Sequence, residues 1–206
     1  EASTLLAFEL FRRENVQWAI FEVGMGGRLD ATNIVLPRVS TIARIALDHQ
    51  EYLGPDLESI AAEKLAIAKK NIPLVMLKPK EPSVHQVAIE HCRMIGAPLI
   101  CADEELAEEV IDTPEGISFR YQGQTFCLPL RGRHQVCNGI LAIESLRAAG
   151  FESLGDISSG LSKARLPGRF QVETVHGRTV VFDVAHNPDA AGVLVDALRR
   201  RFPNKS

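Results

Sequence analysis

The chain has 206 residues, of which 46% are hydrophobic and 24% are charged, and its formal net charge is −3 at pH 7. This composition can build a large core, so it excludes a disordered protein. The small negative charge excludes a typical nucleic-acid binder, and no apolar run approaches the ~20 residues of a membrane helix. The four cysteines lack C-x-x-C spacing and indicate reduced thiols in a cytoplasmic protein, not a disulfide or zinc framework.

Helices and strands alternate in the first half of the sequence. Apolar residues at helical spacing predict a helix over residues 1–14, and a β-branched and aromatic run predicts a strand over residues 16–23. Further strands and helices are predicted over residues 38–47 (strand), 57–70 (helix), 74–77 (strand), 83–95 (helix) and 98–101 (strand). This alternation indicates α/β units around a mostly parallel sheet.

The second half has a different pattern. Two strands, at residues 117–121 and 125–128, flank Gln122-Gly123 and predict an antiparallel hairpin. The elements predicted after it are helices over 132–149 and 153–164, a break at 166–169, strands over 170–175 and 179–184, and a last helix with Asn187 as N-cap and Pro188 in its first turn. The break predicts a domain boundary, with one domain over residues 1–165 and the start of another over residues 166–206.

Both ends of the chain favour a piece of a longer protein. The first residue is Glu1, not Met, and it already belongs to a predicted helix. Residues 199–206 leave the last helix without completing a βα unit. The alternative is a compact small protein with a processed N-terminus.

Polar side chains follow three predicted strands, at the sheet edge where ligands bind in open α/β folds. Glu22 offers the oxygen ligand that Mg²⁺ prefers, but such a carboxylate could equally cap a helix or pair with an arginine. His49 could bind zinc or manganese, although a lone histidine at a strand end is more often structural. The glycines at positions 24, 26 and 27 would let the backbone approach a ligand, but no G-x-x-x-x-G-K-[ST] loop occurs in this chain.

Lys64 is placed by helical geometry at the centre of the apolar face of the helix predicted over residues 57–70. Lys69 and Lys70 lie toward the other side. A lysine on an apolar face must extend to solvent, pair with a charge or be modified, and a neutral amine can react with CO₂ to form an anionic carbamate. Extension to solvent is the commoner outcome, so both readings stay open here.

Four candidates in the second half also have simple structural explanations. Asp183 and His186 flank a strand-to-helix turn whose helix N-terminus favours anions. Asp183 could accept ribose hydroxyls or only cap that helix. Arg169, in a Pro-Gly-Arg turn, could be a solvated arginine, and Asn138 could be an exposed polar residue of its helix.

Six segments together resemble the folylpolyglutamate synthases and dihydrofolate synthases of the Mur ligase superfamily. The most specific is FEVGMGGRLDATN at residues 21–33. The others occur in the family's order, as LDHQEYLG at 47–54, EKLAIAK at 63–69, GRHQVCN at 132–138, PGR at 167–169 and DVAHNP at 183–188. The resemblance spans the whole chain and is weakest between residues 71 and 130.

This resemblance implies an ATP-dependent ligase that joins L-glutamate to dihydropteroate or a folate through an acyl phosphate. It implies a cytoplasmic enzyme that is a monomer when full length and binds neither nucleic acid nor membranes. The implied fold is α/β, with a P-loop ATPase-like central domain, here without its P-loop portion, followed by the start of a Rossmann-like C-terminal ligase domain.

The resemblance also implies roles for individual residues. Glu22 and His49 would bind Mg²⁺, and Lys64 would carry a carbamate that supports a metal. The residues implied to bind ATP are Asn138, Arg169, Asp183 and His186, with His186 also acting in catalysis. The residues implied to lie near the pterin-bearing substrate are Arg28, Asp30, Ala31 and Thr32.

Departures from the family pattern leave alternatives open. The family's phosphate loop lies upstream of these residues, so we expect the 206 residues alone to be inactive. Leu65-Ala66 replaces the usual Ala-Gly, and Gln50 stands where Thr is common. The alternatives are another Mur-type ligase, acting on a cell-wall precursor, and a non-catalytic nucleotide- or folate-binding relic. The motif at residues 30–33 argues against the cell-wall substrate.

Overall fold

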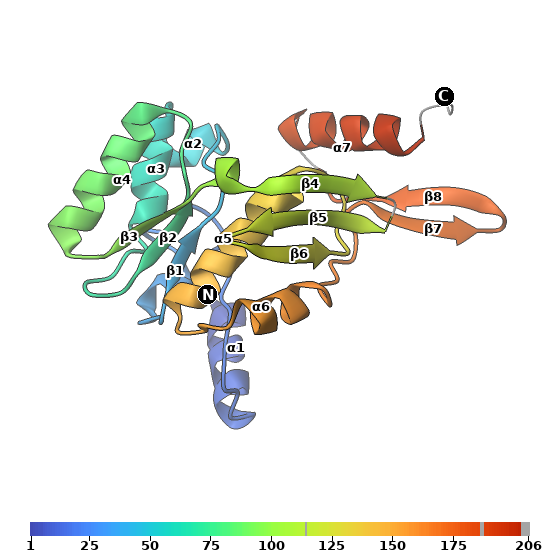
Figure 1. The fold of residues 1–206 in the computed structure, drawn as a ribbon. Helices are drawn as coiled ribbons and strands as arrows, with labels where there is room; N and C mark the ends of the chain where they lie inside the picture. Colours follow the sequence, from blue (N-terminus) through green and yellow to red (C-terminus); the bar gives the residue numbers. More distant parts are fainter. Residues whose placement is uncertain (114, 186–187, 203–206) are drawn as a thin grey trace. The chain divides into compact units, whose positions relative to one another are not determined.

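The computed structural model describes residues 1–113, 115–185 and 188–202 (Figure 1). The chain forms two compact units, Glu1–Ala102 and Asp103–Ser206, and each is described by itself. The boundary expected between residues 165 and 166 falls inside the second unit, so that division into domains stays a prediction. Within the described part of the chain, no helix is both long enough and apolar enough to cross a bilayer.

A three-stranded parallel sheet forms the centre of the first unit (Figure 1). Its strands are β1 (Ser40–Ile42), β2 (Leu74–Leu77) and β3 (Leu99–Ala102), in that order. Helices α3 (Leu57–Leu65) and α4 (Pro82–Ile95) contribute to the same hydrophobic core as the strands. All four residues of β2 are buried, as expected for a central parallel strand covered on both faces. The predicted α/β arrangement with a parallel sheet is confirmed.

Helix α4 begins and ends close to the predicted positions because both ends carry strong signals. Pro82 lies in the first turn, where its missing N–H removes no intrahelical hydrogen bond. Gly96 follows the last turn with a φ of +77°, and its N–H donates to the Cys92 carbonyl. Glycine adopts this left-handed conformation without a Cβ clash, so it ends the helix cleanly.

The predicted strand over residues 16–23 is wrong. This segment pairs with no other strand of the described chain, and Ile20 is 94% exposed. A run of β-branched residues forms a strand only when a neighbour accepts its backbone hydrogen bonds, and sequence composition cannot supply that neighbour. Phe21 is held instead by aromatic contacts with Phe8 and Phe11, at ring-centroid distances of 4.9 and 5.6 Å.

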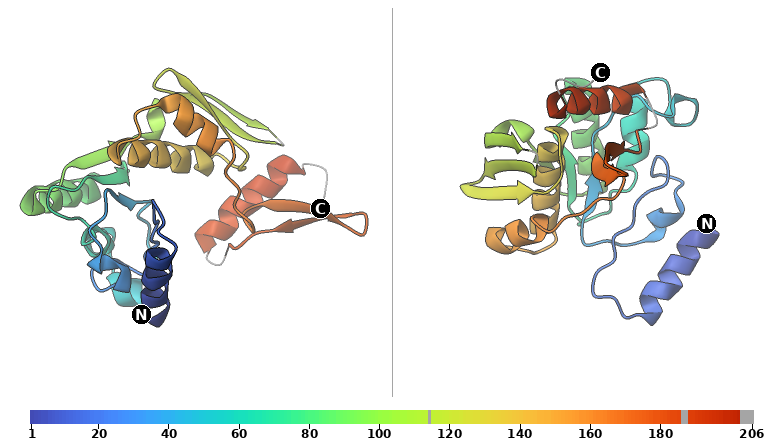
Figure 2. Two further views of the ribbon diagram at one scale, coloured as in Figure 1. Left: turned by 90° about the horizontal axis from the view of Figure 1, so that it is seen from below. Right: turned by 90° about the vertical axis from the view of Figure 1, so that its right-hand side faces the viewer.

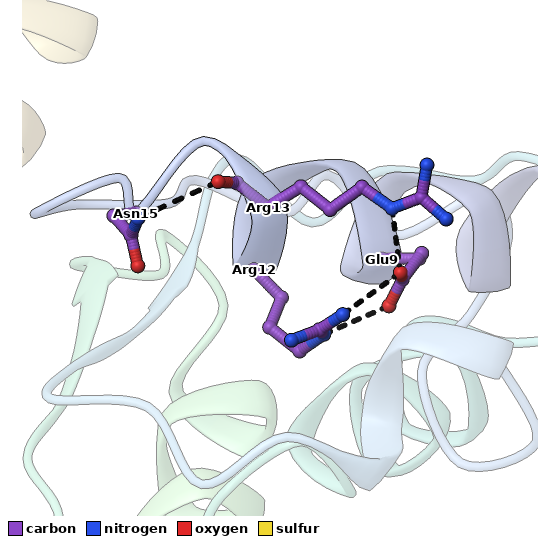
Figure 3. A network of polar contacts seen from close by, with 4 residues as sticks. All are labelled: Glu9, Arg12, Arg13 and Asn15. Carbon is purple, nitrogen blue, oxygen red and sulfur yellow. Dashed lines mark hydrogen bonds and ion pairs between the residues drawn. The ribbon is translucent and has the colours of Figure 1, made fainter.

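Helix α1 (Ala2–Arg13) confirms the predicted first helix, although none of its residues is buried. Figure 3 shows its polar end, where the Glu9 carboxylate accepts hydrogen bonds from Arg12 and Arg13. The Asn15 side chain donates to the Arg13 carbonyl oxygen at 3.4 Å. These contacts are exposed to solvent, which screens them, so they contribute little to stability.

The second unit is built on an antiparallel sheet of β4 (Glu108–Thr113), β5 (Gly116–Tyr121) and β6 (Gln124–Leu128). Figure 2 shows α5 (His134–Ala148) and α6 (Leu154–Leu161) on one side of this sheet. The hairpin predicted from the sequence is confirmed as β5 and β6. The sequence did not predict β4, because its EEVIDT run is polar and mostly exposed and lacks an apolar face.

A second hairpin and the last helix complete this unit. β7 (Gln171–Val175) pairs antiparallel with β8 (Arg178–Phe182), and α7 (Pro188–Arg201) follows. The turn between the strands holds His176 and Gly177 at φ values of +49° and +74°, which fit the twist of a tight hairpin. Both predicted strands are confirmed with shifted ends, whereas Asn187 lies outside the described residues.

A buried polar cluster joins the hairpin of β5 and β6 to α5. The Tyr121 hydroxyl donates to the Glu144 carboxylate at 3.0 Å, and the Gln122 amide donates to the same oxygen at 2.9 Å. Arg147 donates to that oxygen at 3.3 Å. Burial, together with the negative charge of Glu144, raises the pKa of Tyr121 to about 12.

Tyr121→Phe should lower the free energy of unfolding by about 1 kcal/mol, because one buried hydrogen bond is lost while Glu144 keeps two other donors. The folded chain holds the phenol proton to higher pH than the unfolded chain, so wild type should lose stability as the pH rises from about 10 toward 12. Urea unfolding of both proteins at pH 8 and pH 11 measures this. Tyr52→Phe is the control, because Tyr52 is 71% exposed. An equal alkaline loss in Tyr121→Phe would contradict the assignment.

Candidate functional site

Asp30 organises the loop over residues 24–33. Its Oδ2 accepts the N–H of Gly24 at 2.9 Å and that of Met25 at 3.4 Å. Its Oδ1 accepts the backbone N–H of Thr32 at 2.9 Å and the Thr32 hydroxyl at 2.5 Å. Asp30 therefore caps the short 3-10 helix η1 (Ala31–Ile34). Partial burial raises the pKa of Asp30, but these hydrogen bonds outweigh burial, and the pKa lies below its usual value.

Asp30→Asn should lower the free energy of unfolding by about 1–2 kcal/mol at pH 7. Both carboxylate oxygens accept backbone N–H groups, and the amide would replace one of these acceptors with an NH₂ donor. The lowered pKa means that the carboxylate stabilises the fold above its unfolded-state pKa and that this contribution is lost as the pH falls. The difference between wild type and variant should therefore shrink from about pH 5 to below pH 4. Denaturant unfolding across this range measures it, and a constant difference would show that the charge is irrelevant.

This loop packs against the C-terminal end of α3. The Arg28 N–H donates to the Glu63 carbonyl at 3.2 Å, and the Arg28 guanidinium pairs with the Glu63 carboxylate at 2.9 Å. A Cβ on Gly27 would lie 2.8 Å from the Glu63 carbonyl oxygen, closer than real Cβ atoms approach. Glycine at position 27 therefore permits the contact between loop and helix. No motif assigns Glu63 a partner, so the sequence does not predict its pairing with Arg28.

Lys64 lies on the helix turn that this loop contacts. Its backbone falls between the fully buried Ile60 and Leu65, as predicted, but its side chain is half-buried and not enclosed. The helix ends at Leu65, five residues before the predicted end at residue 70. The carbonyl of Lys64 accepts the N–H of Ile67 at 3.3 Å in a tightened last turn. The structure therefore brings Lys64 and the loop together.

Glu22 and His49 both lie in the first unit, and both are exposed. His49 is in the left-handed region, with φ of +49°, and its Nε2 lies 3.9 Å from the Asp48 carboxylate. Among the described residues, no group of three or more histidine, cysteine or acidic side chains is arranged to hold a metal. Mg²⁺ commonly takes one or two protein ligands and fills its remaining positions with water and phosphate oxygens, so the exposed Glu22 carboxylate fits such an ion.

The candidates on α5 and in the turn after α6 are exposed. Asn138 lies on α5, where its amide donates to the Gln135 side chain at 3.1 Å. Gln135 is buried and also contacts the His134 ring at 3.0 Å. Arg169 follows Gly168, whose φ is +72°, and its side chain extends into solvent. Both side chains are therefore accessible to a ligand without being enclosed in a pocket.

Asp183 ties the two ends of the second hairpin together. One carboxylate oxygen accepts the N–H of Phe170 and the other accepts the N–H of Ala185, each at 2.8 Å. These two bonds are structural, but they reach Phe170 and Ala185 and not α7, whose capping the sequence left open. Among the described residues each oxygen accepts one of these hydrogen bonds, which leaves it one lone pair for a hydroxyl donor. His186 lies outside the described residues.

Arg131 is a residue that the sequence analysis missed. Its Nη1 atom is buried without a hydrogen-bond partner among the described residues, and its guanidinium lies 6.0 Å from the Phe170 ring. Burial, together with repulsion from Arg201, lowers its pKa. It lines a cavity of about 180 Å³ beside His134. Arg200, Arg201 and the Asp112 carboxylate line the same cavity. No motif or spacing marks Arg131 in the sequence.

Comparison with known proteins decides the family. The family model described as the Mur ligase middle domain matches residues 1–146. The chain belongs to the Mur ligase family. Its mixed α/β structure, expected from the sequence, agrees with that of solved folylpolyglutamate synthases.

Two curated relatives are similar to the chain over nearly all of its length. It is 42% identical over 201 residues to the dihydrofolate synthase/folylpolyglutamate synthase of Escherichia coli, covering 97% of this chain and 46% of the relative. It is 35% identical to the dihydrofolate synthetase of Saccharomyces cerevisiae, covering all of this chain and 51% of the relative. The chain thus spans about half the length of these relatives.

A solved structure is similar to the chain as well. The structure of E. coli FolC in complex with DHPP and ADP superposes with a TM-score of 0.78 and is 37% identical. The match covers 98% of this chain and 48% of that one. The resemblance to folylpolyglutamate and dihydrofolate synthases seen in the motifs is confirmed.

Proposed function

We propose that the protein containing this chain is an ATP-dependent amide ligase that adds L-glutamate to dihydropteroate, to folates or to both. ATP would phosphorylate the substrate carboxylate, and the glutamate amine would attack the acyl phosphate and release phosphate. The observation that carries this proposal is the packing of the loop over residues 24–33 against the α3 turn that holds Lys64. Two family motifs, at residues 21–33 and 63–69, thereby meet at one place in the fold.

The first unit would hold the metal and the pterin-bearing substrate. Glu22 and His49 would bind Mg²⁺, which supplies positive charge to neutralise the phosphate oxygens. Arg28, Ala31 and Thr32 would line the substrate side of the loop. The four hydrogen bonds that Asp30 accepts inside the loop favour a role in shaping this surface over direct substrate contact.

Lys64 would act as a carbamate. Its neutral amine would attack the carbon of CO₂, forming an N–C bond and releasing a proton to solvent. The half-buried side chain is accessible enough for CO₂ to reach it. The product is an anion that supports a metal where an ammonium would repel it.

The second unit would bind the nucleotide. Asn138 and Arg169 are exposed and free to contact adenine and nearby groups, and the lone pairs left on Asp183 suit a ribose hydroxyl. His186 would contact the nucleotide and act in catalysis. The complex of E. coli FolC with ADP and DHPP supports both substrate classes by similarity. We also propose a cytoplasmic monomer for the full-length protein.

The test is a ligase assay on the full-length protein with ATP, Mg²⁺ and L-glutamate. ADP release that depends on both glutamate and dihydropteroate, or on both glutamate and a folate, is the expected result. Separate assays of the two acceptors decide whether one reaction or both occur. ADP release only with a cell-wall precursor would favour another Mur-type ligase. Nucleotide or folate binding without any turnover would favour a non-catalytic relic.

A further inference from the structure

Lys69 and Asn33, the last residues of the motifs at 63–69 and 21–33, make a connection to which the proposed function assigns no role. The Lys69 ammonium donates to the backbone oxygen of Asn33 and to its side-chain Oδ1, both at 2.8 Å. The Asn33 amide donates to the Ala66 carbonyl and to the Arg28 carbonyl, both at 3.3 Å. We call these four hydrogen bonds the Asn33–Lys69 latch.

The latch satisfies backbone groups that the end of α3 leaves unpaired. The last carbonyls of a helix have no intrahelical partner and need donors from elsewhere. Asn33 supplies one to Ala66, and the Ser40 hydroxyl supplies another to Ile67 at 3.0 Å. The positive charge of Lys69 also lies beyond the helix C-terminus, where the helix dipole favours cations. These contacts supply donors to carbonyls just after Leu65, where α3 ends.

The latch also holds the C-terminal end of the loop over residues 24–33. Arg28 attaches the middle of the loop to Glu63, and Asn33 attaches the end of the loop to Ala66 and Lys69. The two attachments lie on either side of Lys64 in the sequence. A shift of the loop would therefore displace the α3 turn that carries Lys64, and the reverse also holds.

We infer that Lys69 and Asn33 are positioning residues, which hold the substrate loop in register with Lys64 without touching substrate themselves. The bonds to Lys69 are short and charge-assisted and lie in a half-buried place, where solvent screens them less. Asn33 presents two acceptors to one ammonium and a donor amide to two carbonyls, whereas alanine would keep only the backbone acceptor. This inference rests on the proposed function for its consequence in catalysis, but the latch itself does not.

The test compares Lys69→Met with Lys70→Met in the full-length protein. Lys70 is the matched control because it is the adjacent lysine and is exposed. Lys69→Met should lower kcat/KM for the dihydropteroate or folate substrate by about 10- to 100-fold, the scale expected for a misplaced reacting group. Lys70→Met should leave kcat/KM unchanged. The KM for ATP should stay the same in both variants, because neither substitution is placed near the nucleotide. Thermal unfolding of the same samples separates a misplaced loop from a loss of folded protein.

A double-mutant cycle addresses the pairing directly. Asn33→Ala should lose activity as Lys69→Met does, and the double variant should lose no more than the worse single variant. Lys69→Arg, which keeps the charge, should recover part of the activity. Fully additive losses would mean that the two residues act separately, and the latch would be rejected.

Hydrogen exchange of residues 24–33 is a readout that does not depend on turnover. The Arg28 amide, bonded to Glu63, should exchange faster in Lys69→Met than in wild type or Lys70→Met. Identical exchange in all three proteins would overturn the latch even if the wild type is an active ligase. If the wild type has no ligase activity but residues 24–33 still exchange faster in Lys69→Met, the proposed function is overturned and the latch is kept.

Discussion

Glu22→Gln in the full-length protein should lower turnover at limiting Mg²⁺ by about 100-fold, at the upper end of what disturbing a metal site costs. The substitution removes one negative charge and barely changes the shape of the side chain. Because Glu22 is exposed, thermal stability should change little. Initial rates measured against Mg²⁺ concentration should show a higher requirement for the ion. Thermal unfolding of the same samples separates this effect from misfolding.

Glu14→Gln is the control for this result, because Glu14 is an exposed carboxylate of the same unit, at the end of α1. It should keep the wild-type rate at every Mg²⁺ concentration. A Glu22→Gln protein that matched wild type at limiting Mg²⁺ would show that Glu22 is only a structural carboxylate. The proposal that His49 binds Mg²⁺ would then lack Glu22 as the second protein ligand.

Lys64→Ala should lower turnover of the full-length protein by about 100-fold and leave the fold largely intact. The side chain is only half-buried, so its removal leaves no uncompensated buried charge. A short carboxylic acid added to the assay should restore part of the activity, because it can occupy the vacated space as a replacement anion. This rescue tests the carbamate role, because activity lost through poorer packing would not be restored by an added carboxylate.

Lys70→Ala is the matched control for this experiment and should show neither loss nor rescue, because Lys70 is exposed. Glu63 cannot serve as that control, because it pairs with Arg28 on the substrate loop. Full activity of Lys64→Ala would contradict the carbamate. So would an unmodified Lys64 amine extending to solvent in a crystal structure of the nucleotide-bound full-length protein.

Helices and strands whose ends are set by neighbouring residues could be predicted directly from the sequence. The helix of α4 has a proline in its first turn and a glycine after its last, so its ends depend only on nearby residues. The hairpin of β5 and β6 has a Gln122-Gly123 turn, with positive φ at both residues. The parallel sheet followed from the alternation of helices and strands, which requires crossover connections. The motifs gave the family in the same way, because each is a short contiguous run.

Contacts between distant segments decided the rest. Residues 16–23 have strand composition but no strand, because pairing depends on a neighbour and not on propensity. Arg28 and Glu63 pair although they are thirty-five positions apart, and no motif indicates that pair.

Lys69 illustrates the same limit within one helix end. The sequence placed it with Lys70 on the outer side, whereas the structure joins it to Asn33, thirty-six positions away. No helical period can indicate such a pair. The sequence by itself determined the family, the parallel sheet and the residue types of the site, because these are carried by local pattern. Only the tertiary structure decided which of those residues hold the loop and which stay available to a ligand, because hydrogen-bond partners are set by packing.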